Sequence, residues 1–266
     1  MTGSGNDFVM VDARVTVPDD WTTEDIHAVC ARGTGIGADG LVFVGPGKAP
    51  GAIRMVYFNS DGSHAAMCGN AALCSTRLAV HLGLGKPSGF PLETDAGKYE
   101  GKCGNEADRA ELRLPSLEAP VDPHAQLCPG EERAALATVG VPHLVVLVRD
   151  VGAVDLAARG KALRSDPALG PEGANVNFIS PAPRKAAWLM RTYERGIEAE
   201  TLACGTGAVA AACALETWGL DRLPTTIITR TGLPLEIQAR RSPEGPYEDV
   251  WLRGQARMVF RAVLTG

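Results

Sequence analysis

Two stretches of this chain follow one pattern, and each begins with a cysteine followed by a glycine. One runs from Cys68 to Gly83 and the other from Cys204 to Gly219, so the same offset separates both their starts and their ends. Each continues through an apolar, alanine-rich run of helical length before its final glycine, which is typical of a helix and its C-terminal stop. The sequence therefore predicts two equivalent helices, each with a thiol at its N-terminus.

The repetition continues beyond these two helices. Thr94 and Gly97 after the first helix correspond to Thr229 and Gly232 after the second, within alternating segments rich in β-branched residues. Such segments with glycine turns indicate antiparallel strands, and a helix that is apolar on nearly all sides belongs inside a core. We therefore predict an α/β (α+β) fold with two pseudo-symmetric domains, each a mostly antiparallel curved sheet or barrel around a central apolar helix.

The domain boundaries are expected near a segment rich in proline and acidic residues at 115–123. We predict an N-terminal domain from residues 1–115 together with 255–266, and a C-terminal domain from residues 116–254. The moderate alternation of the last residues suggests that they return to the first half of the chain.

Composition narrows the class of protein. The formal net charge is −5 and the isoelectric point is near 5.6, which argues against a nucleic-acid or membrane-surface partner. No apolar stretch approaches the roughly 18 residues that a membrane span needs. The first residues lack the basic and apolar regions of a secretion signal, so we expect a cytoplasmic protein.

The chain has seven cysteines, an odd number, and no Cys-x-x-Cys pair. This pattern argues against a disulfide framework or a zinc ribbon, and five scattered histidines predict no metal site. A single cysteine is ordinarily a small buried hydrophobe. We expect that ordinary role for five of the seven, namely Cys30, Cys74, Cys103, Cys128 and Cys213.

The glycines of residues 35–40 match the spacing of a dinucleotide-binding loop. Such a loop must leave a strand and enter a helix. Here a predicted helix at residues 24–32 precedes the loop and a predicted strand at residues 41–44 follows it. We therefore reject nucleotide binding.

Four other motifs have ordinary structural explanations when each is taken alone. Asn, Asp and Gly are common in turns, and a lone histidine before a strand is more often structural than catalytic. These motifs are Gly3–Phe8, Phe58–Ser63, Gly140–His143 and Tyr193–Gly196.

Taken together, the motifs are far more specific. Gly-Asn-Asp-Phe, Gly-x-Gly-Ala-Asp-Gly, Phe-Asn-x-Asp-Gly-Ser, Cys-Gly-Asn, Pro-His, Asn-x-Asn-Phe, Tyr-Glu-Arg-Gly and Ala-Cys-Gly-Thr-Gly occur in one order across almost the whole chain. In this order the sequence resembles the diaminopimelate epimerase family of cofactor-independent amino-acid epimerases. The resemblance implies two pseudo-symmetric domains, an active site in the cleft between them, and no cofactor.

The resemblance also implies roles for single residues. The two catalytic cysteines of the family fall on Cys68 and Cys204, and the histidine and glutamate that flank them fall on His143 and Glu194. The substrate-binding residues of the family fall on Asn6, Asn59, Gly69, Asn70, Asn175, Glu194, Arg195, Gly205 and Thr206.

Three departures from the family pattern bear on these expectations. Only two residues precede Gly3, where members usually have a longer strand, and the first helix reads Ala71–Cys74 where Gly-Ala-Arg-Cys is usual. Val141 stands where an asparagine commonly precedes Pro-His and contacts the far end of diaminopimelate. Because valine cannot form that hydrogen bond, Val141 bears directly on the identity of the substrate.

The expected reaction converts LL-2,6-diaminopimelate to meso-diaminopimelate by proton transfer between two cysteines. Removing the α-proton places negative charge on the carboxylate, which helix N-termini can stabilise. One sulfur must act as a thiolate base while the other returns a proton to the opposite face. We expect His143 and Glu194 to maintain this one-proton state, and Arg195 to bind a second carboxylate.

Alternatives stay open from the sequence alone. A related racemase acting on another amino acid, such as histidine or a basic one, would use the same cysteines. A binding-only descendant would have no need of paired thiols, and a redox protein would use them as a disulfide. We expect a small amino-acid substrate as partner, and the oligomeric state is undetermined, with a homodimer as one candidate.

Overall fold

The computed structural model describes residues 1–183, 186–242 and 245–264. The chain divides into two compact units, which we treat separately. Unit 1 contains Met1–Arg113 and Arg253–Gly266, and unit 2 contains Leu114–Leu252.

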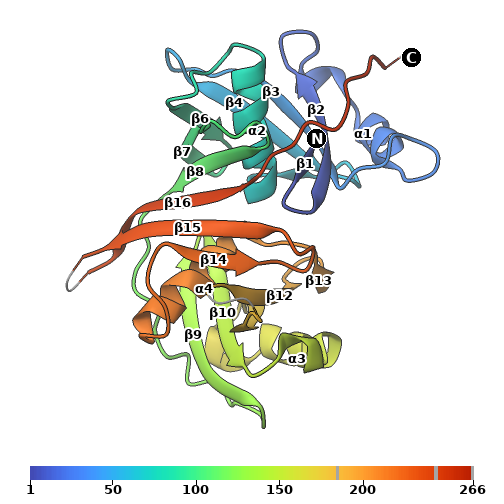
Figure 1. The fold of residues 1–266 in the computed structure, drawn as a ribbon. Helices are drawn as coiled ribbons and strands as arrows, with labels where there is room; N and C mark the ends of the chain where they lie inside the picture. Colours follow the sequence, from blue (N-terminus) through green and yellow to red (C-terminus); the bar gives the residue numbers. More distant parts are fainter. Residues whose placement is uncertain (184–185, 243–244, 265–266) are drawn as a thin grey trace. The chain divides into compact units, whose positions relative to one another are not determined.

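Unit 1 is a sheet whose strands follow the order β1-β2-β3-β4-β6-β7-β8, with β5 paired to β4 (Figure 1). Most neighbours are antiparallel, while β2 pairs with β3 and β4 with β6 in parallel. Its elements are β1 (Thr2–Gly3), β2 (Asn6–Asp12), α1 (Thr23–Cys30), β3 (Gly40–Pro46), β4 (Ile53–Asn59), β5 (His64–Ala65), α2 (Gly69–His81), β6 (Phe90–Thr94), β7 (Gly97–Lys102) and β8 (Arg109–Leu114).

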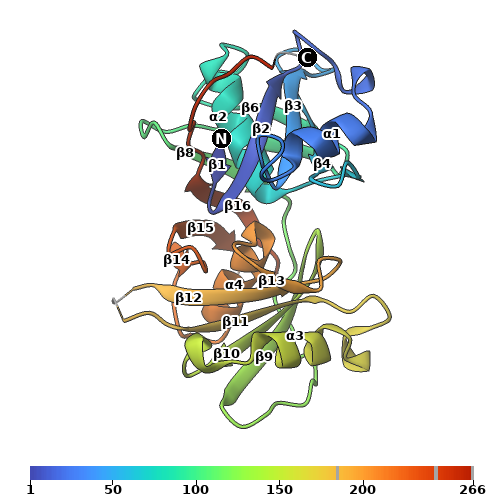
Figure 2. The same ribbon diagram turned by 90° about the vertical axis from the view of Figure 1, so that its right-hand side faces the viewer.

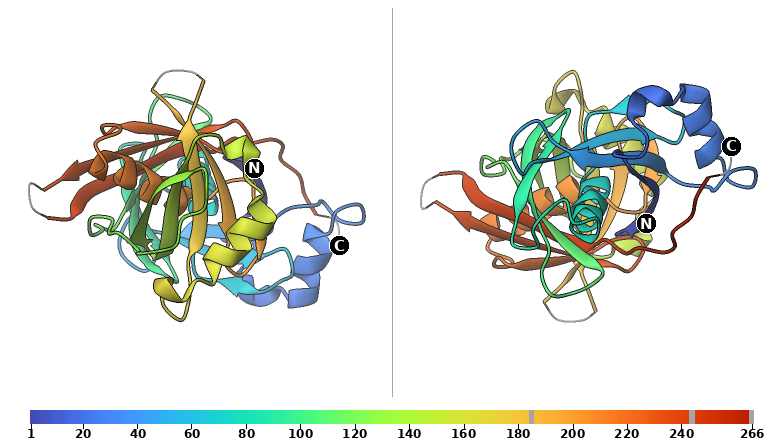
Figure 3. Two further views of the ribbon diagram at one scale, coloured as in Figure 1. Left: turned by 90° about the horizontal axis from the view of Figure 1, so that it is seen from below. Right: turned by 90° about the horizontal axis from the view of Figure 1, so that it is seen from above.

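Helix α2 is the centre of unit 1, and the strands of that unit surround it (Figure 3, right). It contacts β1, β2, β3, β4 and β7. Its alanines and leucines are therefore buried through most of its length. The helix ends as the sequence predicts: Gly83 has φ +70°, and the Leu84 N–H donates to the Ala79 carbonyl at 2.9 Å. This is the Schellman arrangement that a glycine permits.

Helix α1 packs against the other face of β3, around Ile26, Leu41 and Phe43. The Thr22 hydroxyl accepts from the Asp25 N–H, and the Thr22 N–H donates to the Asp25 carboxylate, which forms a capping box at the N-terminus of the helix. The helix is slightly shorter than the predicted 24–32. It precedes the glycine loop, and strand β3 follows the loop. This confirms the predicted order of helix, loop and strand, which is the reverse of the order in a dinucleotide-binding site.

Unit 2 has the strand order β9-β10-β11-β12-β14-β15, with β13 paired to β12 and β16 next to β15 (Figure 2). Strands β10 and β11 are parallel, as are β12 and β14. Its elements are β9 (Glu131–Val139), β10 (Val141–Val148), α3 (Leu156–Arg164), β11 (Asn175–Pro181), β12 (Trp188–Glu194), β13 (Ala199–Thr201), α4 (Gly205–Thr217), β14 (Thr225–Ile228), β15 (Pro234–Arg241) and β16 (Tyr247–Gln255). The last residues of β16, from Arg253, belong to unit 1.

Helix α4 is the central helix of unit 2. It contacts β9, β10, β11, β14 and β15, and every residue from Gly207 to Leu215 is buried. It ends like α2, because Gly219 has φ +69° and Leu220 N–H donates to the Leu215 carbonyl at 2.9 Å. A central apolar helix within a largely antiparallel sheet in each unit confirms the predicted fold class.

Helix α3 covers the other face of the unit 2 sheet. Its Leu156 and Leu163 pack with Leu144 on β10, Val176 on β11 and Tyr193 on β12. Side chains alternate between the two faces of a strand. The residues next to these three sheet positions, among them His143, Asn177 and Thr192, therefore point to the opposite face, where α4 lies.

The end of the chain returns to unit 1. Strand β16 ends at Gln255, and Arg257 exchanges two backbone hydrogen bonds with Thr2, each 2.8 Å long. The remaining described tail forms no further strand. None of the helices in the described parts of the chain is both long and apolar enough to cross a membrane.

Candidate active site

Cys68 is the residue from which α2 begins. Its backbone is extended, with φ −142° and ψ 123°, and its carbonyl accepts the first helical hydrogen bond from the Ala72 N–H at 2.9 Å. The thiol is therefore carried at the N-terminus of the central helix, where the backbone N–H groups and the helix dipole favour negative charge. Gly69 and Asn70 form the first turn beside it.

A chain of side chains joins Asn70 to Asn6 at the start of β2 and to Asp39 directly before β3. The Asn70 Nδ2 donates to the Asn6 Oδ1 at 2.7 Å, and the Asn6 Nδ2 donates to the Asp39 Oδ2 at 2.8 Å. Because a carboxylate only accepts hydrogen bonds, Asp39 fixes the orientation of the Asn6 amide. Asn6 in turn requires that Asn70 present its Nδ2, which leaves the Asn70 Oδ1 buried without a hydrogen-bond partner among the described residues.

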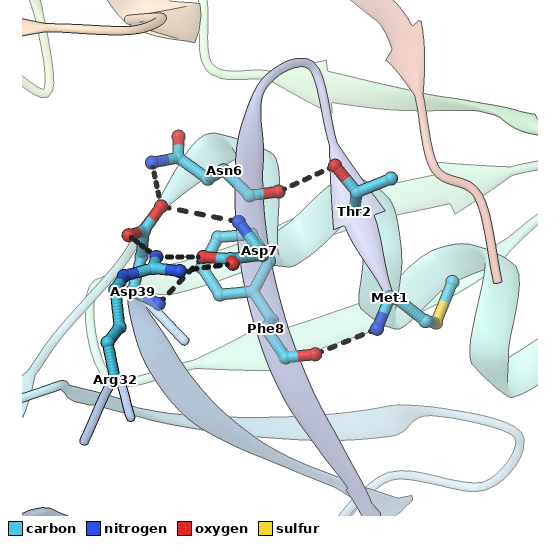
Figure 4. Close-up of polar contacts among 7 residues, drawn as sticks. All are labelled: Met1, Thr2, Asn6, Asp7, Phe8, Arg32 and Asp39. Carbon is cyan, nitrogen blue, oxygen red and sulfur yellow. Dashed lines mark hydrogen bonds and ion pairs between the residues drawn. The ribbon is translucent and has the colours of Figure 1, made fainter. Parts of the chain in front are cut away.

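Arg32 and Asp7 hold Asp39 in place (Figure 4). The Arg32 guanidinium bonds Asp7 at 2.7 Å and Asp39 at 2.8 Å, and the Asp39 N–H donates to the Asp7 carboxylate at 3.0 Å. Burial alone would raise the pKa of Asp7, but the hydrogen bonds and positive charge of Arg32 hold that pKa below its ordinary value. The Asp7 carboxylate therefore stays ionised.

Asn59 lies elsewhere in unit 1, at the end of β4. Its Nδ2 donates to the Ser63 Oγ at 3.0 Å, and Asp61 accepts from the Ser63 N–H at 2.9 Å. The local hydrogen bonds are those of a turn, which agrees with the structural explanation of this motif. The structure joins Asn6 and Asn70 directly, but it shows no such bond between either of them and Asn59 in the described chain.

Cys204 occupies the same position on α4 that Cys68 has on α2. It is the N-cap residue, with φ −125° and ψ 108°, and its Sγ accepts a hydrogen bond from the Gly207 N–H at 3.3 Å. The Thr206 hydroxyl lies 3.6 Å from the same sulfur. A sulfur that receives an N–H at a helix N-terminus is stabilised as a thiolate.

His143 is completely buried on β10, on the face that α4 covers. Burial lowers the pKa of its imidazole to about 3, and the positive charge of Arg195 acts in the same direction. His143 is therefore neutral at pH 7. The Asn177 Nδ2 lies 3.3 Å from its Nδ1, and its Nε2 is buried without a partner in the described chain.

Asn175 and Arg195 meet at the ends of neighbouring strands. The Asn175 Oδ1 accepts the Arg195 backbone N–H at 2.8 Å, which leaves the Asn175 Nδ2 as a donor. The Arg195 guanidinium bonds the Glu172 carboxylate at 3.0 Å, and Glu172 is 75% exposed. Burial raises the pKa of Glu194, the last residue of β12, above its ordinary value.

The other buried cysteines have a different environment. Burial raises the pKa of Cys74 and of Cys213 to about 12, because no compensating positive charge or hydrogen bond outweighs the loss of water. Both lie inside the central helices. They fit the predicted role of buried hydrophobes, whereas Cys68 and Cys204 lie at the helix starts. The same prediction was wrong for Cys128, which is exposed because it lies in the loop before β9.

Val141 is the first residue of β10, directly after Gly140 at the turn from β9. Its side chain is half-buried and offers no hydrogen-bonding atom. The asparagine expected from the family pattern is therefore not replaced by another polar group at this position.

Sequence reasoning assigned no role to several residues that organise the two helix starts. The sequence marks most of these residues only by placing them within the ordered motifs. They are Asp7, Arg32, Asp39, Asn177 and Thr192. The described residues contain no cluster of three His, Cys, Asp or Glu side chains arranged for a metal.

Solved structures share the fold of this chain. A phenazine biosynthesis protein of the PhzF family from Bacillus anthracis superposes with a TM-score of 0.70 at 14% identity, over 96% of this chain and 91% of that one. A hydroxyproline epimerase from Agrobacterium vitis superposes with a TM-score of 0.63 at 19% identity, over 96% and 86%. The fold is thus the one shared by PhzF proteins and amino-acid epimerases.

Sequence comparison then gives the family. The family model for diaminopimelate epimerase matches residues 1–113 and 135–250. The diaminopimelate epimerase of Gemmatimonas aurantiaca is 45% identical over 100% of this chain and 98% of its own length, and that of Aquifex aeolicus is 35% identical over 100% and 96%. The chain belongs to the diaminopimelate epimerase family, and it is therefore an isomerase of the amino-acid epimerase type.

Proposed function

We propose that this protein converts LL-2,6-diaminopimelate to meso-diaminopimelate, with Cys68 and Cys204 as the two proton-transfer groups and without a cofactor. The observation that carries the proposal is the placement of a cysteine at the N-terminus of each central helix. In the forward direction one sulfur, as a thiolate, takes the α-proton. The other, as a thiol, gives a proton to the opposite face of the same carbon, so the substrate gains and loses one proton.

The helix N-termini supply the electrostatic part of this mechanism. Removal of the α-proton moves negative charge onto the neighbouring carboxylate. The backbone N–H groups of Gly69 and Asn70, and those of Gly205 and Thr206, are the proposed donors to it, because they belong to the first turns of α2 and α4. Fixed donors directed at developing charge are usually the largest single catalytic contribution.

The proposed recognition of the far end of the substrate depends on Arg195 and Asn175. The Arg195 guanidinium already binds a carboxylate, that of the exposed Glu172, and such an exposed ion pair is weak enough for a substrate to replace. The Asn175 Nδ2 is a second donor to a carboxylate. Asn59 and Asn6 are the proposed contacts from unit 1, and the Asn70 Oδ1 is a buried acceptor suited to an ammonium N–H.

His143 and Glu194 are proposed to keep the protonation states of the site in order. His143 is neutral, so it cannot add a positive charge that would hold both sulfurs as thiolates. Burial favours the neutral form of Glu194. With His143 neutral and Glu194 favoured in its neutral form, no nearby charge from these two residues forces both cysteines into the same protonation state. One cysteine can then be a thiolate while the other is a thiol.

Val141 supports a second candidate, a racemase for another amino acid. Without the asparagine amide at this position, one hydrogen bond to a distal group of diaminopimelate is lost, worth about 0.5–1.5 kcal/mol. An amino acid with a different side chain would not need that bond. The catalytic cysteines and helix N-termini would serve both substrates equally.

Exchange of the α-hydrogen in D₂O, followed by proton NMR in fresh reductant, tests both candidates. The substrates are LL- and meso-diaminopimelate, histidine, lysine, arginine and glutamate. Deuterium incorporation confined to diaminopimelate supports the first candidate, and incorporation into another amino acid instead supports the second. Absence of exchange with every substrate, at full reduction of the thiols, would contradict both.

We also propose a homodimer and a cytoplasmic location. Unit 1 has a cavity of about 780 Å³ lined mostly by apolar residues of β2, α2 and the tail, and apolar side chains lie exposed around it, among them Val15, Phe260 and Val263. Contiguous exposed apolar surface is typical of interfaces. A monomeric mass by light scattering at micromolar concentration would reject the dimer.

A further inference from the structure

A chain of three buried polar side chains lies under the first turn of α4. Thr192, Asn177 and His143 come from the neighbouring strands β12, β11 and β10. Asn177 stands opposite Thr192 and opposite Val145 in the sheet register. All three are essentially without solvent exposure. His143 has a proposed role in the reaction, whereas Asn177 and Thr192 have none.

The neighbours of Asn177 determine which way its amide is turned. Its Nδ2 donates to the Leu144 carbonyl at 3.3 Å, and its Oδ1 accepts from the Thr192 hydroxyl at 2.9 Å. A carbonyl can only accept a hydrogen bond. The amino side of the amide must therefore face Leu144, and the hydroxyl of Thr192 can satisfy the opposite side.

The orientation of this amide determines the tautomer of His143. The same Nδ2 group lies 3.3 Å from the His143 Nδ1, so this ring nitrogen faces a donor and must be the acceptor. In a neutral imidazole the proton then resides on Nε2. Burial, together with the charge of Arg195, lowers the pKa of the ring to about 3, which agrees with a neutral ring at pH 7.

The resulting Nε2–H group is a buried donor without an acceptor among the described residues. Leaving such a donor unpaired is costly, because the buried N–H loses its hydrogen bond to water. A general base would need a free electron pair on Nε2, but the electron pair of this ring is on Nδ1 and faces Asn177. The ring can thus donate to an acceptor that arrives with the substrate, and it cannot remove a proton through Nε2.

Gly207 connects this polar chain to the candidate catalytic sulfur. A Cβ atom on Gly207 would lie 2.3 Å from the Asn177 Oδ1 and 3.2 Å from the Cys204 Sγ. The amide of Asn177 and the sulfur of Cys204 therefore both pack against the same residue. The Gly207 N–H also donates to that sulfur.

We propose that Asn177 is a positioning residue that locks His143 in the Nε2–H tautomer, so that His143 acts as a neutral hydrogen-bond donor to an anionic acceptor of the reacting complex. This inference rests on the proposed function in assigning a catalytic setting to His143. The tautomer itself is a property of the protein alone, so it can be measured whichever amino acid is the substrate.

Long-range ¹H–¹⁵N correlation NMR on protein labelled with ¹⁵N-histidine tests the inference directly. The chain has five histidines, and the signals that disappear in the His143→Gln variant identify His143. At pH 7 we expect a protonated Nε2 and an unprotonated Nδ1. A proton on Nδ1 of the wild-type ring, alone or with one on Nε2, would overturn the proposal.

Asn177→Asp tests the cause of the tautomer. A carboxylate beside Nδ1 accepts a proton where the amide donates one, so we expect Nδ1 to become protonated and kcat to fall by at least about tenfold, with KM nearly unchanged. The wrong tautomer of a catalytic histidine can cost up to about 10⁴-fold in kcat. Unaltered kcat in a folded Asn177→Asp protein would refute a positioning role.

Thr192→Val is the matched control. It removes the hydroxyl that donates to the Asn177 Oδ1 but leaves the Leu144 carbonyl, which still fixes the amide. We expect the Nε2–H tautomer to persist, with a smaller loss of kcat than for Asn177→Asp. A switch to the Nδ1–H tautomer in this variant would mean that Leu144 does not orient the amide, which contradicts the argument.

Discussion

The Asn70 amide on α2 donates its Nδ2 hydrogen to the Asn6 Oδ1 of β2 at 2.7 Å. This bond joins the first turn of the helix that carries Cys68 to Asn6, and Asp39 fixes the orientation of the Asn6 amide. Through Asn6, the Asp39 carboxylate thereby determines that Asn70 keeps its Oδ1 as the atom without a partner among the described residues.

Asp39→Ala tests the importance of this arrangement. Without the carboxylate, the Asn6 amide can turn over, and the Asn70 Oδ1 is no longer held as the free acceptor. We expect kcat/KM to fall by about tenfold, equivalent to roughly 1.4 kcal/mol, with a smaller change in thermal stability. The control is Asp12→Asn at the end of β2, because Asp12 pairs with the surface Arg14 and has no bond to Asn6 or Asn70 among the described residues. Equal effects of the two variants would contradict the prediction.

Alanine at either candidate catalytic cysteine should abolish most of the α-hydrogen exchange. Cys68→Ala and Cys204→Ala each remove one proton-transfer group, which typically contributes about 10²- to 10⁴-fold. The readout is deuterium incorporation in D₂O together with racemisation measured by circular dichroism. Cys128→Ser, at an exposed cysteine, should leave both rates unchanged. Near-normal rates in either alanine variant would disprove the two-cysteine mechanism.

Gly207→Ala should destabilise the protein although alanine is the better helix former. The exchange of Gly for Ala in a helix normally gains up to about 1 kcal/mol. Here the new Cβ would lie 2.3 Å from the Asn177 Oδ1, so overpacking of about 1–3 kcal/mol opposes that gain. Urea unfolding measures the difference. Gly104→Ala, where a Cβ would meet no atom within 4 Å, is the control and should change stability by less than about 0.5 kcal/mol.

His143 should make the protein less stable as the pH falls. Its pKa is about 3 in the folded protein, whereas the ordinary pKa of histidine is 6.5. The unfolded chain therefore binds a proton below pH 6.5 that the folded chain does not, and stability falls as the pH decreases toward 3. One proton corresponds to a slope of about 1.4 kcal/mol per pH unit.

The free energy of urea unfolding at pH 7, 6, 5 and 4 measures this slope. His143→Gln should reduce the slope by the contribution of one proton. His124→Gln, at a histidine whose side chain is 90% exposed, should leave the slope as in the wild type. An unchanged slope in His143→Gln would show that the buried ring does not control this pH dependence.

Glu172→Gln should tighten substrate binding if Arg195 binds the distal carboxylate. The Glu172 carboxylate competes for the guanidinium, but the exposed pair contributes at most about 1 kcal/mol. We expect KM to fall by no more than about fivefold, with kcat unchanged, while Arg195→Met raises KM. Glu198→Gln, which removes a similar surface partner from Arg164, should leave KM as it is. A rise in KM for Glu172→Gln would argue against this role of Arg195.

The sequence predicted the two helices that organise the fold because their signals are local. An alanine-rich run needs only its own residues to indicate a helix, and Gly83 and Gly219 end α2 and α4 through their own φ angles. The same holds for α1 before the glycine loop, which sufficed to reject a nucleotide site. The order of the motifs was enough to indicate the family.

The sequence by itself thus determined the central helices, their cysteine starts, the fold class and the family. The tertiary structure decided the hydrogen bonds that orient the polar groups near those cysteines. Asn177 meets His143 and Thr192 only because the register of β10, β11 and β12 brings them side by side. Asn6 meets Asp39 across 33 residues of chain. Contacts of this kind depend on strand pairing, which joins segments distant in sequence, and no local pattern of residues specifies them.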